Sequence, residues 1–115
     1  MKLHLLRTTD QQAQGVIGLD KLEPDDVFFF PGVGWRWSCF HMQGVPFDIS
    51  IAFLDGNFRI LQVALLQAQV GLAVPPWGTQ HAAEADATYF QRHGLTTGME
   101  WTELREKVEH LRKQS

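Results

Sequence analysis

Residues 47–66, FDISIAFLDGNFRILQVALL, predict two antiparallel strands joined by a hairpin. Large apolar side chains occupy every odd position from 47 to 53, and this period of two is typical of a strand with one buried face. The Asp55-Gly56-Asn57 segment that follows favours a tight turn, because these residues tolerate positive backbone φ angles. The returning segment, 58–66, is apolar on both faces, so we expect it to be a central strand.

Further strands are predicted on either side of this hairpin, over 27–30, 35–43 and 81–85. Turn-forming residues such as Pro and Gly separate these segments. Residues 67–79 contain Pro75-Pro76-Trp77-Gly78 and are expected to form a longer loop. The predicted class is α+β, with a mainly antiparallel curved sheet or a partly closed small barrel, short flanking helices and a C-terminal helix.

Three short helices are expected around the sheet. Thr9 with Gln12 gives a capping-box pattern for the first helix, which Gly15 ends. A brief second helix follows Asp86 and is closed by Gly94. The third helix begins at Thr102.

The third helix carries an apolar stripe at helical spacing. We expect this stripe to pack on the sheet of the same chain, and packing against a second subunit in a homodimer is the alternative. Residues 1–101 would then form one β-rich domain, and residues 102–115 a helical extension of it. The stripe consists of Trp101, Leu104, Val108 and Leu111.

Composition excludes several classes of partner. The chain has 115 residues, enough for one domain, and 44% of them are hydrophobic. The net charge of −3 argues against nucleic-acid binding, which needs a clustered basic face. No apolar run is long enough for a membrane helix, and Arg7 ends the apolar N-terminal run, so neither a membrane partner nor a signal peptide is predicted and a cytoplasmic location is expected.

Metal and cofactor sites are not predicted either. Cys39 is the single cysteine, so the chain cannot form an internal disulfide. His41, His81 and His93 are far apart and show none of the spacings of metal-binding motifs. No glycine-rich loop carries the lysine of a nucleotide-binding motif. We therefore expect neither a metal nor a cofactor.

The segment FHMQGVPFDI, residues 40–49, together with AFLD at 52–55 and FRIL at 58–61, resembles the domain-of-unknown-function family 192. Later matches are Pro75-Pro76, Ala83-Glu84-Ala85 and Gly94-Leu95-Thr96-Thr97-Gly98, so the resemblance spans residues 5–101. It implies a mostly β fold and no defined chemistry. The chain departs from the family pattern in carrying His41, Gln43 and Gly44 in place of the usual Trp, Lys and Asn, Val16-Ile17 in place of Leu-Met, and Met99 in place of an acid.

Two carboxylates are candidates for chemistry. Asp48 lies on the strand face opposite Ile49, where it would serve as a general base or, alternatively, accept backbone N–H bonds at the 45–46 turn. Glu84 stands in an alanine-rich strand, and such a carboxylate is either exposed or paired. A pair formed by Asp48 and Glu84 would suit a hydrolase or a lyase. An ion pair of either carboxylate with Arg36 or Arg59 is the simpler alternative.

The strand predicted over 35–43 places Trp35, Trp37, His41 and Gln43 on one face. Such a face is either part of the core or a stacking surface for a small polar or planar ligand. The sequence therefore leads to three functional hypotheses. The first is a non-enzymatic ligand-binding or interaction module whose pocket contains these four residues with Asp48 and Glu84. The others are the hydrolase or lyase and a structural protein that oligomerises through its C-terminal helix.

Overall fold

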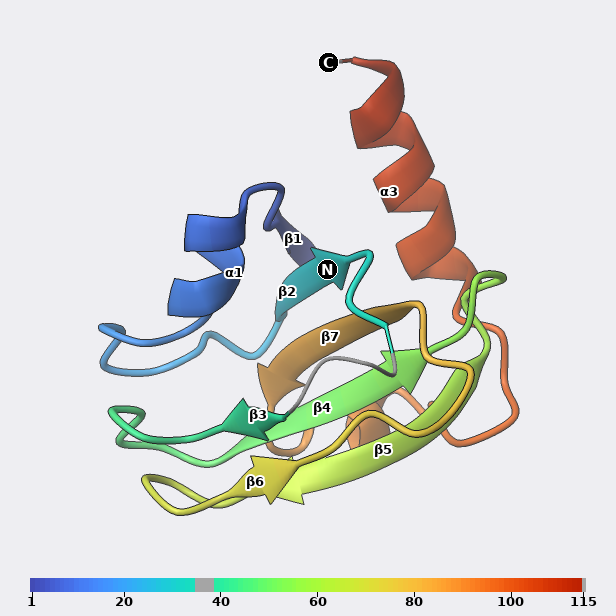
Figure 1. Cartoon of the computed structure of the whole chain (residues 1–115). Coiled ribbons are helices and arrows are strands. Elements are labelled where there is room, and N and C mark those ends of the chain that lie inside the picture. Colours follow the sequence, from blue (N-terminus) through green and yellow to red (C-terminus); the bar gives the residue numbers. More distant parts are fainter. Residues whose placement is uncertain (35–38, 115) are drawn as a thin grey trace.

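Five strands form the main sheet of the computed structural model, which describes residues 1–34 and 39–114 (Figure 1). The two strands at one end of this sheet are parallel, and all other neighbours are antiparallel. In order across the sheet, the strands are β1 (Lys2–Leu5), β2 (Asp26–Pro31), β7 (His81–Asp86), β4 (Ile49–Leu54) and β5 (Ile60–Leu66). A separate pair of short strands contains β3 (Phe40–His41) and β6 (Leu72–Ala73).

The predicted α+β class with a mainly antiparallel sheet is confirmed. The sheet is open, however, with β1 and β5 at its two edges, so the alternative of a partly closed barrel is wrong. Closure of a barrel would require hydrogen bonds between these two edge strands. Three other strands, β2, β7 and β4, separate them.

The hairpin predicted over 47–66 is present as β4 and β5, paired from Ile49 with Leu66 to Leu54 with Ile60. The carboxylate of Asp55 accepts hydrogen bonds from the backbone N–H groups of Asn57 and Arg59, which holds the turn. Phe58 takes a positive φ of 62° there. β5 is an edge strand and not the predicted central one, and its apolar side chains contact both cores of the domain because both layers extend over it.

The strands predicted over 27–30 and 81–85 are present as β2 and β7, whereas the segment predicted over 35–43 differs from the prediction. Within the predicted strand over 35–43, the structure describes β strand only at Phe40–His41, and this segment pairs with β6 rather than with β4. β6 lies inside the segment predicted as a loop. The parallel edge strand β1 was not predicted, because four residues of mixed character give no periodic signal.

The helices agree with the sequence to within a residue or two. α1 (Thr9–Gln14) is capped by Thr8 with Gln11, one residue earlier than predicted, and ends at Gly15. α2 (Tyr89–Arg92) is preceded by Asp86, whose carboxylate accepts hydrogen bonds from Thr88. α3 (Thr102–Lys113) begins where it was predicted to begin.

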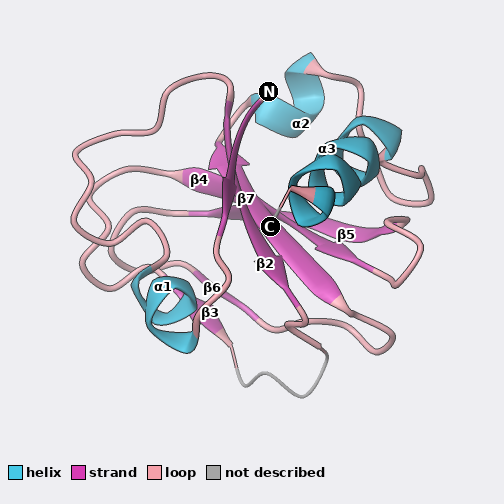
Figure 2. Ribbon diagram, turned by 90° about the horizontal axis from the view of Figure 1, so that it is seen from above, coloured by secondary structure: helices cyan, strands magenta, loops and turns pink. Residues whose placement is uncertain are grey.

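Two hydrophobic cores lie on opposite faces of the sheet. α1, β3 and β6 cover one face, and α2 and α3 cover the other (Figure 2). Ile49, Ile51 and Phe53 of β4 contact the first core, whereas Ala52 and Leu54 contact the second. The alternation along β4 is therefore as predicted, but both faces of the strand are buried, since small side chains allow α3 to approach.

Candidate functional site

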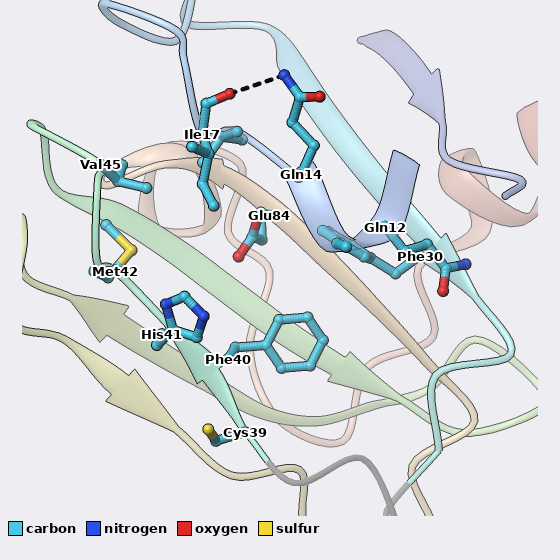
Figure 3. Close-up of a pocket in the computed structure, with 13 residues that line it drawn as sticks. Gln12, Gln14, Ile17, Phe30, Cys39, Phe40, His41, Met42, Val45 and Glu84 are labelled. Atoms are coloured by element: carbon cyan, nitrogen blue, oxygen red, sulfur yellow. Dashed lines mark hydrogen bonds between the residues drawn. The ribbon is translucent and has the colours of Figure 1, made fainter. Parts of the chain in front are cut away.

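A cavity of about 300 Å³ lies on the face of the sheet that carries α1 and β3 (Figure 3). Phe30 of β2 and Glu84 of β7 form its floor, and we call residues 12–17 the cavity roof. The remaining wall comes from β3, the residue before it and the turn after it, and consists of Cys39, Phe40, His41, Met42 and Val45.

Glu84 is held in the middle of the main sheet. Its backbone pairs with Phe28 on one side and with Ile51 on the other. Because side chains of a strand alternate between faces, Glu84 points to the same face as the apolar residues of the first core. Figure 3 shows its carboxylate directed into the space below the roof.

The environment of this carboxylate is unusual for a charged group. Glu84 is only 5% exposed, and among the described residues it has no hydrogen-bond or ion-pair partner. Burial raises the pKa of Glu84 from 4.5 to about 7. The side chain is therefore a mixture of acid and carboxylate near neutral pH, able to donate or accept a proton.

The cavity roof is fixed to the sheet by one side chain of α1. Nε2 of Gln12 donates hydrogen bonds of 3.0 Å to the carbonyl oxygens of Leu6 and Pro31. Gly15 then brings the backbone over the floor with a φ of +50°. A Cβ atom at Gly15 would stand 3.4 Å from Cζ of Phe30 and 3.6 Å from Oε1 of Glu84, so the glycine keeps this end of the cavity open.

The wall is held by the loop around β6. The backbone N–H of Met42 donates to the carbonyl of Gly71, and that of Gly44 donates to the side chain of Gln69. These bonds place Met42 and Val45 against the first core, with 1% exposure each. His41, by contrast, is exposed at the cavity.

The structure brings together two of the predicted site residues, His41 and Glu84. Gln43 is exposed and does not line the cavity. Trp35 and Trp37 lie outside the described residues, as does Arg36. Arg59, the other proposed ion-pair partner, donates to the carbonyl of Gly98 instead.

Asp48 is not part of the cavity. It is exposed, and its Oδ1 accepts a hydrogen bond of 2.8 Å from the backbone N–H of Ala68. This bond holds the loop after β5, not the 45–46 turn named in the prediction. Ile49, the next residue, points toward the same face as Glu84, so Asp48 starts on the other face. The predicted Asp48–Glu84 pair is therefore not formed.

Sequence reasoning missed most of the lining. Gln12, Gly15 and Met42 come from segments that meet only through tertiary contacts. Gly15 was recognised as a helix end, and that role is confirmed, but its position above Glu84 carries no local signal. Glu84 stood out among the alanines, but the expectation that it would be exposed or paired is wrong, because it is 5% exposed and has no partner among the described residues.

A family model for DUF192, described as uncharacterized ACR, matches residues 1–102. The chain belongs to the DUF192 family. The resemblance drawn from residues 40–61 is thereby confirmed, and most of α3 lies beyond the matched part. No curated protein matches this DUF192 chain.

Two solved structures share the fold of this DUF192 chain. A protein of unknown function from Novosphingobium aromaticivorans DSM 12444 has a TM-score of 0.69 and 20% identity, covering 84% of this chain and 70% of that one. A "putative transcription regulator" from Sinorhizobium meliloti 1021 has a TM-score of 0.70 and 16% identity, covering 84% and 76%. At these identities the comparison establishes the fold alone.

In residues 1–34 and 39–114, no group of three His, Cys, Asp or Glu side chains is placed to hold a metal ion. Over the same ranges, no helix has the length and apolar character needed to cross a membrane.

Proposed function

We propose that this chain is a small-molecule binding module and that the ligand occupies the cavity above Glu84. The observation that carries this proposal is the buried carboxylate, which is 5% exposed and unpaired among the described residues. Buried polar groups in folded proteins are nearly always hydrogen-bonded, so a carboxylate facing an open cavity is suited to a ligand as its partner.

The lining suits this role. Apolar side chains such as Val16, Met42 and Val45 surround the single buried carboxylate. Ligand pockets commonly combine apolar walls with a few placed polar groups, and a volume of about 300 Å³ lies at the small end of their range. The proposed site retains His41 and Glu84 from the sequence-derived set and adds Gln12 and Gly15.

A fragment screen by NMR tests this function. We expect fragments to shift the methyl resonances of Val16, Met42 and Val45. Ala13→Trp places a large ring at an exposed position of the cavity roof and should weaken these shifts. Asp10→Trp is the matched control, because it adds the same ring to α1 outside the lining. Fragments that shift only resonances outside the cavity would contradict the proposal.

A second candidate function is favoured by the titration of Glu84. General acids and bases work best when their pKa lies near the operating pH, and the pKa of Glu84 is about 7. A hydrolase or lyase would then use Glu84 without Asp48. Turnover of a substrate panel that disappears in Glu84→Gln, with the fold intact, would support this reaction class. Retained turnover in that variant would exclude it.

The third hypothesis was oligomerisation through the C-terminal helix. Most of the apolar stripe that it would use is buried within the same chain. Trp101, Leu104 and Val108 are between 0% and 2% exposed and pack in the second core of the same chain. These contacts support packing of the stripe on its own sheet rather than against a second subunit, although its fourth member, Leu111, is only half-buried.

A further inference from the structure

The charge of the lining restricts what the cavity can hold. Glu84, His41 and Cys39 are the titratable residues among the described lining, and none of the described lining residues is Lys or Arg. An anionic ligand would meet a carboxylate with no fixed cation among the described lining residues to offset its charge. A ligand with a positive charge would instead replace the hydration that burial removes from Glu84.

Aromatic rings beside the carboxylate also favour a ligand with a positive charge. Phe30 and Phe40 both line the cavity, with ring centroids 5.4 Å apart and planes at 89°. Cations are attracted to the faces of aromatic rings, and both of these rings line the cavity. Apolar parts of a ligand would contact Ile17, Met42 and Val45.

The volume limits the size of the ligand. The cavity volume of about 300 Å³ lies at the small end of the range for ligand pockets, which suits a compact ligand. Gly15 lies over Glu84 and, having no side chain, leaves the carboxylate uncovered at this point. The polar head of a ligand therefore has access to the carboxylate, while its body stays among the apolar residues.

We infer that the cavity binds a small organic cation, an ammonium or amidinium group on a compact apolar body, through a charge-assisted hydrogen bond to Glu84. This inference rests on the proposed binding function and specifies its ligand class. The cation donates N–H groups to the carboxylate, its positive charge lies near the Phe30 and Phe40 rings, and its apolar body displaces water from the wall.

Three probes of similar size and different charge test this inference. 2-Phenylethylammonium is the cation, 2-phenylethanol its neutral counterpart and 3-phenylpropionate its anionic counterpart. Titrations followed on the methyl resonances of Met42 and Val45 should give an affinity for the cation at least about tenfold above that for either counterpart, since one charge-assisted bond accounts for that ratio. The affinity for the cation should also rise at least about tenfold from pH 5 to pH 8, as Glu84 ionises.

Glu84→Gln separates the carboxylate from the other titratable groups. In this variant the preference for the cation and its pH dependence should both disappear, whereas binding of 2-phenylethanol should change little. A pH dependence that persists in Glu84→Gln would assign it to His41 or Cys39 and overturn the inference. Glu109→Gln is the matched control, because Glu109 is exposed on α3, in the layer on the other face of the sheet.

The two proposals fail in different ways. If 2-phenylethanol or 3-phenylpropionate binds in the cavity as tightly as the cation, the ligand class is wrong and the binding function stands. If none of the three probes shifts the cavity resonances at millimolar concentration, the cation inference is overturned, and the fragment screen alone then decides the binding function.

Discussion

Gly15 and Glu84 face each other across the cavity, such that a Cβ atom added to the glycine would stand 3.6 Å from Oε1 of the carboxylate. The two residues are 69 positions apart in the chain but meet because the C-terminal end of α1 lies over Phe30 of β2 and Glu84 of β7. Gly15 has two roles: it adopts a positive φ without strain, and its lack of a side chain leaves space beside the Glu84 carboxylate. Substitutions can test these two roles separately.

Gly15→Ala should destabilise the fold and raise the pKa of Glu84 further. The positive φ of +50° costs a residue with a side chain about 1–3 kcal/mol, and the new methyl group would remove water from the carboxylate. Urea unfolding measures the first effect, and a carbon-13 NMR titration of the Glu84 carboxyl group measures the second. Gly32→Ala is the control, because Gly32 has a φ of +76° with no atom within 4 Å of the added Cβ. Identical Glu84 titrations in the two variants would contradict the assigned contact.

The stability of the protein should fall as pH rises from about 4.5 to about 7 through the contribution of Glu84. Its pKa is raised in the folded state, so the folded state binds the proton more tightly than the unfolded state does within this window. The contribution amounts to about 3 kcal/mol, fully present below the unfolded pKa and lost above the folded one. Glu84→Gln should remove this fall in stability with pH. Urea unfolding midpoints of the parent and the variant at pH 5 and pH 8 would measure the difference.

The contribution of His81 to stability has the opposite pH dependence, and it must be distinguished from the contribution of Glu84. Burial lowers the pKa of His81, so its contribution to stability increases as pH rises toward 6.5. His81 is present in both the parent and Glu84→Gln, and the difference between their pH profiles therefore isolates the carboxylate. Parallel profiles for the two proteins would show that Glu84 does not titrate as proposed.

Asp48→Ala should cost about 1 kcal/mol of stability and leave ligand binding unchanged. The substitution removes the acceptor for the backbone N–H of Ala68, a bond of 2.8 Å at an exposed position. Asp48→Asn keeps an acceptor oxygen and should recover most of the loss. Thermal unfolding compares the three proteins, and an unchanged melting temperature in Asp48→Ala would refute a structural role for the bond.

Leu104→Ala should destabilise the protein by about 2–5 kcal/mol, since it leaves a cavity in the second core. Leu65→Ala is the control, because Leu65 is 60% exposed and its truncation should cost less than about 0.5 kcal/mol. Chemical denaturation gives both values. Similar small losses would mean that α3 is not held on the sheet, and the stripe of the helix would again be open to a partner.

Local patterns predicted the parts of this fold that depend on neighbouring residues. The alternation over 47–54 and the Asp55-Gly56-Asn57 turn indicated the β4–β5 hairpin, since the turn and the two strands are contiguous. The start of α3 and its buried stripe were likewise evident from helical spacing. Glu84 was recognised because a carboxylate among alanines contradicts the character of its strand.

Long-range pairing could not be predicted in the same way. β7 lies between β2 and β4, and nothing near His81–Asp86 in the sequence specifies those neighbours. Ser50 and Ala52 suggested an exposed face, yet small residues are also what a buried strand needs where a helix layer approaches it. The prediction of an Asp48–Glu84 pair was wrong for the same reason. It required knowing both the face on which Asp48 lies, just before β4, and the register in which β7 pairs with β4.

The parallel pairing of β1 with β2 has a consequence for how the cavity is made. Two parallel neighbours require the chain between them to return along the sheet, and here that return segment contains α1 and Gly15. If the cavity binds a ligand as proposed, binding would be thermodynamically linked to the docking of the first thirty or so residues. Their outermost strand, β1, has one unpaired side and is the first expected to fray. A bound molecule would stabilise β1 against local unfolding. The backbone amides of β1 would then exchange their hydrogens more slowly, although the molecule does not contact them.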